Sequence, residues 1–337
     1  MDFDLVSGPV VRRLIDESRS EIIEIVRTTY LEHHRGRSVN PRSYFLRFPD
    51  KPSARIIALP AYLGGENQLA GLKWIGSFPT NIETNLPRAS SVLILNDYAT
   101  GYPFACLEAS HISSARTAAS AVLGAEHLVG SKAADNVLII GAGVLGRAVA
   151  DFLLDQQWAI GGFSVFDSDT RYAQALAAHI SRSGTDASPV DDVNAAIRRA
   201  DLIVLVTTSA RPWLTDPSQL RAGQCVLNIS LRDLSAEVIL AAHNIVDDVD
   251  HCLTADTSPH LAEQLVGHRR FIDGTLAQLI LGDVKLEADK PKVFSPFGLG
   301  VLDLAVGAHV HRAAAHRGLA TSVPDFFAQT ERWDSAE

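Results

Sequence analysis

The stretch at residues 136–146 reads NVLIIGAGVLG, and it decides the fold of the residues around it. A short apolar run predicts a buried strand, and it leads into a complete G-x-G-x-x-G turn followed by an apolar helix. Gly141 permits the tight turn, Gly143 lets the backbone approach a pyrophosphate, and Gly146 lets helix and strand pack closely. This order of strand, turn and helix predicts a dinucleotide-binding unit.

An acidic residue stands where such a unit places one. The next predicted strand, 163–167, ends at Asp167, which lies 21 residues after Gly146. A carboxylate here accepts the ribose hydroxyls of NAD and repels the 2′-phosphate of NADP, although the nearby Arg171 complicates that argument. NAD is therefore the predicted cofactor. Its predicted contacts in this region are Gly141, Gly143, Val144, Leu145, Gly146 and Asp167.

The composition is typical of a soluble globular protein. The chain has 337 residues, enough for two domains with full cores, and 47% of them are hydrophobic. Its formal net charge is −9 and no extended Lys/Arg run exists, so we expect neither nucleic acid nor a membrane as partner. The cysteine and histidine spacings predict no metal site. The start lacks a signal-peptide pattern and no apolar run is long enough to span a bilayer, which favours a cytoplasmic location.

Two kinds of patterning divide the chain. In the first third, a helical segment at 9–35 precedes short extended pieces separated by turns, one of them at 64–67, which predicts a mostly antiparallel sheet with a flanking helix. From Asn136 onward, strands alternate with helices, which predicts a doubly wound parallel sheet. An apolar helix at 301–315 has a Gly/Ala-rich face that could pack back on the first region. The predicted strands of the parallel sheet are 137–140, 162–166, 202–206, 225–228 and 244–246.

Two cationic side chains interrupt runs of apolar or small residues. Lys73 lies inside the predicted strand at 69–75, where a lysine is costly unless it is paired or used. Arg116 enters a helix of small residues, and arginine is the usual partner of a substrate carboxylate. Alternatively, Lys73 is an edge-strand lysine with its head in water, and Arg116 forms a surface pair with an aspartate.

Polar residues also follow two strands of the predicted parallel sheet. Asp233 and Ser230 follow the strand 225–228, whereas Thr207 and Thr208 follow the strand before it. Open α/β sheets bind their ligands at such carboxyl ends, so we expect these residues to line the cofactor site. Asp233 could equally be the N-cap of a helix.

The first region carries a set of arginines. Clustered guanidinium groups could bind a substrate with several negative charges, and a solvated surface is the alternative for at least one of them. The set comprises Arg42, Arg47, Arg55 and Arg88.

Taken together, these motifs resemble the ornithine cyclodeaminase/mu-crystallin family over roughly residues 5–320. Within the family, the chain is most similar to the branch that makes L-2,3-diaminopropionate for siderophores and antibiotics. The strongest parts of the family resemblance are 71–73, 116–119, 141–146 and 228–233. The runs typical of the branch are 55–60, 71–77, 88–91, 95–97 and 108–114.

The resemblance implies a homodimer with an α/β fold. A Rossmann-type doubly wound parallel sheet that binds NAD, residues 119–302, is inserted in an α+β substrate-binding and dimerisation domain, residues 1–118 and 303–337. The family's carboxylate-binding arginine and its lysine correspond to Arg116 and Lys73, and its acid near the scissile amine corresponds to Asp233.

The other substrate contacts that the resemblance implies are arginines of the first region. Arg42 matches one family pattern and Arg47 matches the diaminopropionate branch, while Arg88 lies in a run typical of that branch. Departures from the cyclodeaminase pattern around Lys73 and after Asp233 weaken the case for ornithine as substrate.

The reaction implied is the oxidation of N-(2-amino-2-carboxyethyl)-L-glutamate by NAD⁺, followed by hydrolysis to L-2,3-diaminopropionate and 2-oxoglutarate. Asp233 would remove the amine proton, Lys73 would hold a carboxylate and assist proton transfer with a pKa depressed by arginines, and Arg116 would clamp the α-carboxylate. The alternatives are a cyclodeaminase that returns the hydride, a non-catalytic ligand-binding protein of the mu-crystallin type, and a simple imine reductase or amino-acid dehydrogenase.

Overall fold

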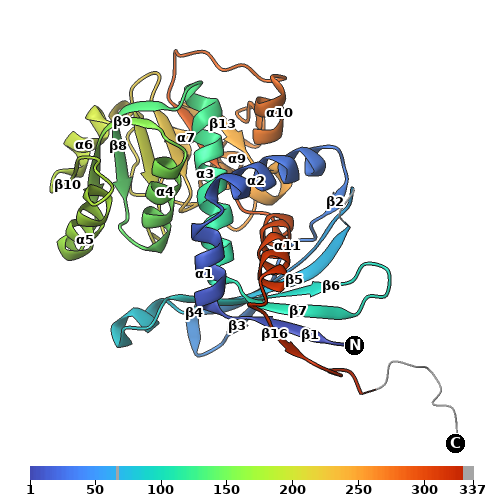
Figure 1. Ribbon diagram of the computed structural model, residues 1–337. Coiled ribbons are helices and arrows are strands. Elements are labelled where there is room, and N and C mark those ends of the chain that lie inside the picture. The colour runs from blue at the N-terminus through green and yellow to red at the C-terminus, as the bar shows by residue number, and fades with distance from the viewer. Residues whose placement is uncertain (66–67, 329–337) are drawn as a thin grey trace, which may run out of the picture. The chain divides into compact units, whose positions relative to one another are not determined.

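The computed structural model describes residues 1–65 and 68–328. The chain divides into two compact units, which we call unit 1 (Met1–Arg116 with Leu299–Glu337) and unit 2 (Thr117–Gly298) (Figure 1). The boundaries predicted from the sequence were 118/119 and 302/303. Part of the predicted turn at 64–67, and the predicted domain's last residues 329–337, lie outside the described residues.

Unit 1 is built on an eight-stranded sheet with the order β16-β1-β7-β6-β5-β4-β2, in which β3 also pairs with β4. Neighbouring strands are antiparallel except β1 and β7, which confirms the predicted, mostly antiparallel sheet. The strands are β1 (Phe3–Val6), β2 (Ser38–Val39), β3 (Tyr44–Phe48), β4 (Lys51–Leu63), β5 (Leu69–Ser77), β6 (Ala89–Asn96), β7 (Pro103–Glu108) and β16 (Thr321–Val323). The extended pieces expected from the sequence do not include β1, β2, β7 or β16.

The helices of unit 1 differ from the prediction at one point. The single helical segment expected at 9–35 is two helices: Glu17 is the C-cap of the first and Ser18 is the N-cap of the second. The Ser18 hydroxyl donates to the Leu14 carbonyl at 2.7 Å. The helical elements are α1 (Gly8–Asp16), α2 (Arg19–His34), the 3₁₀ turn η1 (Pro79–Thr84), the start of α3 (Ser110–Val129) and α11 (Gly300–His316).

Helix α11 packs on one face of the unit 1 sheet, against β4, β5 and β6 (Figure 1). Glycines allow this close approach: a Cβ on Gly71 of β5 would lie 2.7 Å from Cδ2 of Leu304, and one on Gly307 would lie 2.0 Å from Cδ2 of Leu93. We call the covered side the inner face. Because side chains alternate along a strand, Lys73, which pairs with Leu93 across β5 and β6, lies on this inner face.

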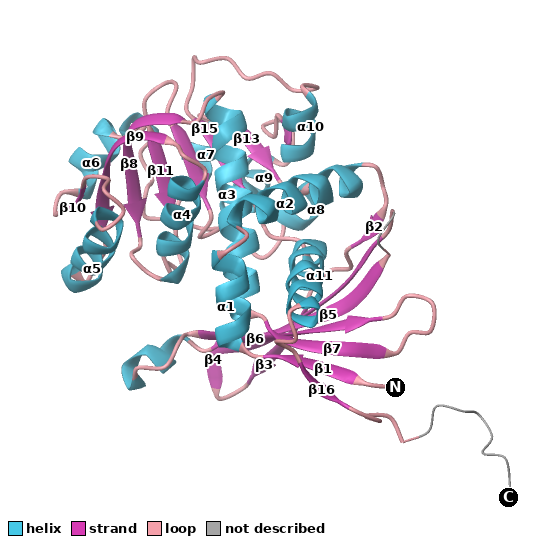
Figure 2. Ribbon diagram, in the orientation of Figure 1, coloured by secondary structure: helices cyan, strands magenta, loops and turns pink. Residues whose placement is uncertain are grey.

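Unit 2 is an eight-stranded parallel sheet with helices on its two faces (Figure 2). Every strand pair in it is parallel, which confirms the predicted doubly wound fold. Its strands are β8 (Ala133–Ile140), β9 (Ala159–Phe166), β10 (Ala187–Pro189), β11 (Leu202–Leu205), β12 (Cys225–Asn228), β13 (His243–Val246), β14 (Gly274–Thr275) and β15 (Lys292–Ser295). Besides the remainder of α3, its helices are α4 (Val144–Asp155), α5 (Thr170–Ser181), α6 (Val193–Arg199), η2 (Pro217–Gln219), α7 (Ala236–Leu240), α8 (Val249–Cys252), α9 (Ser258–Val266) and α10 (Leu276–Leu281).

The strands lie in the order β10-β9-β8-β11-β12-β15-β13-β14. The side on which the chain adds its next strand changes between β8 and β11. The chain builds outward from β8 through β9 and β10, and then returns to the other side of β8 with β11. In open α/β sheets a ligand binds at the carboxyl ends of the strands where this reversal occurs. The loops after β8, β11 and β12 therefore form the expected ligand-binding edge of unit 2.

Apolar side chains alternate between two cores in unit 2. Leu138 of β8 lies in a buried cluster with Ile197 of α6, Ile239 of α7 and Ala262 of α9. Ile139, one residue on, faces the start of α4 on the opposite side of the sheet. The strand after Asn136 is thus buried on both faces, as a parallel strand between two helix layers must be.

Candidate active site

The three glycines of the G-x-G-x-x-G turn at 141–146, which we call the fingerprint turn, differ in what surrounds them. Gly141 has a φ of +104°, and a Cβ there would lie 2.6 Å from the Val206 carbonyl oxygen. A Cβ on Gly146 would lie 2.4 Å from the carbonyl oxygen of Gly141, whereas one on Gly143 would meet nothing within 4 Å. Gly141 and Gly146 are thus required by the protein's own packing. Gly143 is not, and its open side is where a pyrophosphate needs space.

Helix α4 begins at this turn. Gly143 is its N-cap, and Val144 and Leu145 are its first two residues. Val144 is 69% exposed. The unpaired N–H groups of a first helical turn attract anions, so the turn suits a phosphate group.

Asp167 follows β9 and holds the fingerprint turn in place. Its Oδ2 accepts a hydrogen bond from the Ala142 N–H at 2.7 Å, and its Oδ1 accepts from the Asp169 N–H at 3.0 Å. Arg171, which could have favoured NADP, instead contacts Asp169, with Nη2 2.7 Å from Oδ2. The hydrogen bond from Arg171 lowers the pKa of Asp169. The arginine is thus engaged next to a carboxylate, which favours NAD over NADP.

The polar residues after β11 and β12 meet at one carboxylate. Asp233 is fully buried; the Thr207 hydroxyl donates to its Oδ1 at 2.6 Å, and the Ser230 hydroxyl donates to its Oδ2. The helix-cap alternative for Asp233 is wrong, because the N-cap of α7 is Ser235. Thr208 is exposed and takes no part in this cluster. The role of Asp233 as a base stays a prediction, with both of its carboxylate oxygens already accepting hydrogen bonds.

In unit 1, Lys73 and Arg116 lie together around a carboxylate that the sequence analysis missed. The ammonium of Lys73 donates to Asp303 Oδ2 at 2.7 Å and to the Ser113 hydroxyl at 3.1 Å. Nε of Arg116 donates to Asp303 Oδ1 at 3.2 Å. Asp303 has 0% exposed side chain, Lys73 2% and Arg116 12%. The edge-strand alternative for Lys73 is therefore wrong, and the aspartate partner of Arg116 is buried rather than on the surface.

The surroundings of Lys73 change its proton affinity. The pKa of Lys73 is lowered to about 8: burial is the largest cause, the charge of Asp303 opposes it, and the charge of Arg116 acts in the same direction as burial. The predicted direction is confirmed, but the arginine is a smaller cause than desolvation. The ammonium is thus mostly charged at pH 7 and loses its proton close to the physiological range.

The arginine set separates in the structure. Arg47 of β3 pairs directly with Arg55 of β4, and Arg55 pairs with Ser77 of β5. Arg88 donates to the Ser77 hydroxyl at 2.9 Å, and burial lowers its pKa. Arg47 and Arg55 are thus cross-strand partners, and the Arg88 side chain contacts Ser77, the next residue across the sheet; we call these three arginines the arginine row. Arg42 is exposed in the loop before β3 and is not part of this row.

Alternation along β5 places the arginine row on the same face as Lys73, two inner-face positions farther along that strand. In the described part of the chain neither Arg47 nor Arg88 forms an ion pair. The guanidinium groups of these two residues therefore add positive charge to this face.

The sequence analysis does not single out Asp303, although an acid is unusual at its position. It is the one acidic residue of α11, a helix made otherwise largely of Ala, Val, Leu, Gly and His. A lone carboxylate within an apolar helix is as costly as a lysine within an apolar strand. The two exceptions, 230 residues apart, are partners.

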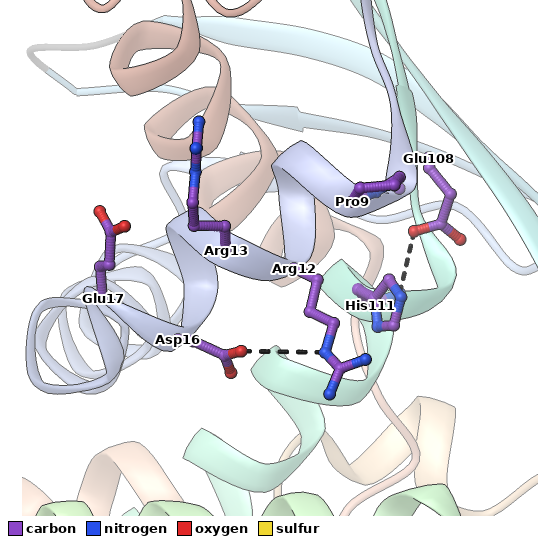
Figure 3. Close-up of a pocket in the computed structure, with 8 residues that line it drawn as sticks. Pro9, Arg12, Arg13, Asp16, Glu17, Glu108 and His111 are labelled. Atoms are coloured by element: carbon purple, nitrogen blue, oxygen red, sulfur yellow. Dashed lines mark hydrogen bonds and ion pairs between the residues drawn. The ribbon is translucent and has the colours of Figure 1, made fainter.

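A charged surface hollow also exists in unit 1, but none of the predicted site residues lines it (Figure 3). Its acids and bases engage near neighbours: Arg12 pairs with Asp16 at 3.8 Å, and the Glu108 carboxylate accepts from the Ser110 N–H at 2.7 Å, at the start of α3. The carboxylates of Asp16 and Glu108 are therefore already engaged within the hollow.

Neither a metal site nor a membrane-spanning helix is found among the described residues. Residues 1–65 and 68–328 contain no group of three or more His, Cys, Asp or Glu side chains that could hold a metal ion. None of the helices described is long and apolar enough to cross a membrane.

Known proteins resemble the chain over most of its length. It is 31% identical over 282 residues to the N-((2S)-2-amino-2-carboxyethyl)-L-glutamate dehydrogenase of Staphylococcus aureus, a match that covers 80% of this chain and 82% of that protein. The crystal structure of CmnK matches with a TM-score of 0.87 at 27% identity, over 97% of this chain and 99% of the other.

A third relative is the Thermococcus litoralis Delta(1)-pyrroline-2-carboxylate reductase, solved with NADH and L-proline. It has a TM-score of 0.87 at 23% identity, over 95% of this chain and 100% of the other, and at that identity it supports the fold alone. The predicted oxidoreductase class and nicotinamide cofactor agree with what these relatives are named for or solved with. The sequence matches the ornithine cyclodeaminase/mu-crystallin family over residues 13–317, and the chain belongs to that family.

Proposed function

We propose that this chain, an NAD-dependent oxidoreductase, oxidises N-((2S)-2-amino-2-carboxyethyl)-L-glutamate and hydrolyses the resulting imine. The products are L-2,3-diaminopropionate, 2-oxoglutarate and NADH. The Staphylococcus aureus relative named for this substrate supports the proposal, as do the sequence runs shared with the diaminopropionate branch. The product would serve siderophore or antibiotic biosynthesis.

The observation that carries the proposal is the charge balance around Asp303. Two buried cations, Lys73 and Arg116, share one buried carboxylate, so the group has a net charge of +1 when Lys73 is protonated. An uncompensated buried charge is costly, and a substrate carboxylate would compensate it. The α-carboxylate of an amino-acid substrate is the group we assign there.

The arginine row supports a substrate with more than one carboxylate. Arg47 and Arg88 add positive charge on the Lys73 face of the same sheet. Ornithine carries a single carboxylate and a distal ammonium, which this row would repel. The proposed substrate has three carboxylates, so it can satisfy both Lys73 with Arg116 and the row.

The chemistry begins when the secondary amine of the substrate loses its proton. The hydride then leaves the glutamate Cα for NAD⁺ while the nitrogen lone pair forms the C=N bond. Water adds to this carbon, and the C–N bond breaks as the amine of diaminopropionate takes up a proton. Asp233 is our proposed acid–base group for the amine and for water, and it would exchange protons through the Thr207 or Ser230 hydroxyl that encloses it. Lys73 would bind carboxylate as an ammonium and assist proton transfer.

The cofactor contacts we propose are those of the fingerprint turn and of the adjacent strand ends. Unpaired N–H groups of α4 would bind the pyrophosphate, and Asp167 would accept the ribose hydroxyls through lone pairs that Ala142 and Asp169 leave available. An enzyme that reduces NAD⁺ needs the nicotinamide pool, so we place this chain in the cytoplasm.

We also propose that the chain is a homodimer formed through the outer face of the unit 1 sheet. One row across that face contains Tyr44, Trp74 and Val92, which are 73%, 40% and 39% exposed. A row of large exposed apolar side chains is typical of a protein interface, and a second copy would bury it. Light scattering of the wild type and of Trp74→Glu tests this: a dimer that becomes a monomer supports it, and a wild-type monomer contradicts it.

The reaction is tested with purified protein, NAD⁺ and N-(2-amino-2-carboxyethyl)-L-glutamate by following NADH absorbance and analysing the products. Stoichiometric NADH, 2-oxoglutarate and diaminopropionate support the proposal. A parallel sample with ornithine is the control. Proline from ornithine without net NADH would identify a cyclodeaminase. The absence of NADH and of these products in both samples would exclude both reactions.

A further inference from the structure

Asp303 is a carboxylate between two cations, Lys73 and Arg116, that we expect to bind a substrate carboxylate. A carboxylate that touched the substrate here would repel it, so its contribution must act through its neighbours. Each of its oxygens faces a different cation: Oδ2 lies 2.7 Å from Lys73 Nζ, and Oδ1 lies 3.2 Å from Arg116 Nε. One side chain thus connects a strand residue and a helix residue that are both predicted to bind substrate.

Donor counting shows what this arrangement leaves for a ligand. An ammonium has three N–H groups and a guanidinium has five. In the described part of the chain, Asp303 and Ser113 each accept one hydrogen bond from the Lys73 ammonium and one from the Arg116 guanidinium. The bond from Arg116 to Ser113 is the longest, at 3.5 Å. One ammonium N–H and three guanidinium N–H groups remain, enough for the two oxygens of one carboxylate.

The position of Asp303 is fixed by the packing of α11. Gly307, one turn after Asp303, packs on Leu93, which is the cross-strand partner of Lys73. Leu304 packs on Gly71, two residues before Lys73 in the same strand. These contacts set the register of the helix on the sheet, and they place Asp303 at Lys73. Its location in the first turn of α11 also favours a negative charge, because N–H groups at a helix start are unpaired.

We propose that Asp303 is a positioning residue that holds the ammonium of Lys73 and the guanidinium of Arg116 together as a receptor for one substrate carboxylate. Without it, two buried cations would face each other with no anion, and they would separate or one would lose its charge. The inference rests on the proposed function for the identity of the substrate, but the geometry of the receptor does not depend on that identity.

The test compares Asp303→Asn with Asp303→Glu and with a matched control, Asp4→Asn. Asp4 also pairs with α11, through His311 at 2.8 Å, but it is not part of the receptor. The probes are 2-oxoglutarate and NAD⁺, each titrated by calorimetry. We expect Asp303→Asn to weaken 2-oxoglutarate binding about 30-fold or more, as loss of charged hydrogen bonds does, with NAD⁺ affinity unchanged. Asp303→Glu should recover part of the loss, and Asp4→Asn should show none.

A second readout distinguishes positioning from a merely structural role. The Lys73 side chain is titrated by NMR of ¹³C-labelled lysine, its signal identified with Lys73→Arg. Loss of the neighbouring anion should move the titration of Lys73 to lower pH in Asp303→Asn and not in Asp4→Asn. If Asp303→Asn does not fold, Asp303→Glu is measured in the same two ways, because a displaced carboxylate should also weaken binding and shift the titration.

Wild-type 2-oxoglutarate binding together with an unchanged Lys73 titration in the Asp303 variants would overturn the proposal. The titration requires no substrate, so it separates this inference from the proposed reaction. A wild type that makes no NADH from the amine, with a shifted Lys73 titration in Asp303→Asn, would reject the reaction and keep the positioning role.

Discussion

Asp303 in unit 1 and Asp233 in unit 2 both have no exposed surface, and they are stabilised in different ways. Asp303 in unit 1 is neutralised by two cations, Lys73 and Arg116. Asp233 in unit 2 accepts hydrogen bonds from two hydroxyls, those of Thr207 and Ser230. The first arrangement creates a charged group that can exchange partners with an anionic ligand. The second joins the loops after β11 and β12 at the cofactor-binding edge without adding positive charge.

This difference predicts that the two sites respond differently to substitution. Changes around Asp303 should affect the amino-acid ligand, and changes around the fingerprint turn should affect NAD. Each of the following substitutions or pH changes therefore asks whether one ligand is affected without the other.

The largest effect is expected for Lys73→Ala. It removes the buried ammonium and leaves Asp303 with Arg116 alone, so we expect turnover to fall by about 10³-fold or more, equivalent to ~4 kcal/mol of barrier. NAD⁺ affinity, measured by calorimetry, should stay at the wild-type value. The matched control is Lys51→Ala, an exposed lysine of the same sheet, which should behave as wild type. Normal turnover by Lys73→Ala would show that Lys73 neither binds the substrate carboxylate nor assists proton transfer.

Asp233→Asn should have the next largest effect. An amide keeps the size of the side chain but cannot take up a proton, so kcat should fall by about 10²-fold if Asp233 is the acid–base group. Thr207→Val, which removes only one of the enclosing hydroxyls, should show a smaller loss. If instead Asp233→Asn changed only the KM for NAD⁺, the aspartate would serve to hold the loops, and its role as a base would be rejected.

The pH dependence of ligand binding tests the charge of Lys73. Its pKa of about 8 means that the ammonium is present below that pH and lost above it. The inhibition constant of 2-oxoglutarate, which has no amine of its own, should therefore rise toward tenfold per pH unit above pH 8, up to the limit set by the neutral form. A constant value between pH 7 and pH 9.5 would show that the ammonium does not bind this carboxylate.

The smallest effects should separate two glycines of the same turn. Gly146→Ala places a Cβ 2.4 Å from the Gly141 carbonyl oxygen, so we expect a loss of about 1–3 kcal/mol in the free energy of unfolding. Gly143→Ala meets nothing within 4 Å, so its thermal unfolding should be normal while NAD⁺ binding weakens about tenfold. Equal stability losses in both variants would contradict this division of roles.

The sequence predicted best what depends on neighbouring residues. The fingerprint turn, Asp167 and the parallel strands around them could be recognised because strand, turn and helix are contiguous. The strand β15 was not predicted; it comes last in the chain among the strands of unit 2 but lies between β12 and β13 in the sheet. The division between α1 and α2 was missed because both helices have apolar spacing and only Glu17 and Ser18 separate them.

The site of unit 1 could be predicted only in part, for a physical reason. Lys73 and Arg116 were recognisable because each is costly or unusual where it stands. Asp303 became their partner only through the register of α11 on the sheet, which no local pattern encodes. The arginine row likewise depends on strand register, which brings Arg47 opposite Arg55 and leaves Arg42 outside. The candidate residues Lys73 and Arg116 could therefore be recognised from the sequence, whereas the residues they act with are determined by the three-dimensional fold.

The most direct test of the proposed reaction follows one hydrogen atom. The substrate N-(2-amino-2-carboxyethyl)-L-glutamate is prepared with deuterium on the glutamate Cα and incubated with the protein and NAD⁺, and the nicotinamide product is analysed by mass spectrometry. Our account predicts one deuterium in each NADH formed, with unlabelled 2-oxoglutarate as the organic product. Deuterium that stays in, or returns to, the organic product would contradict it.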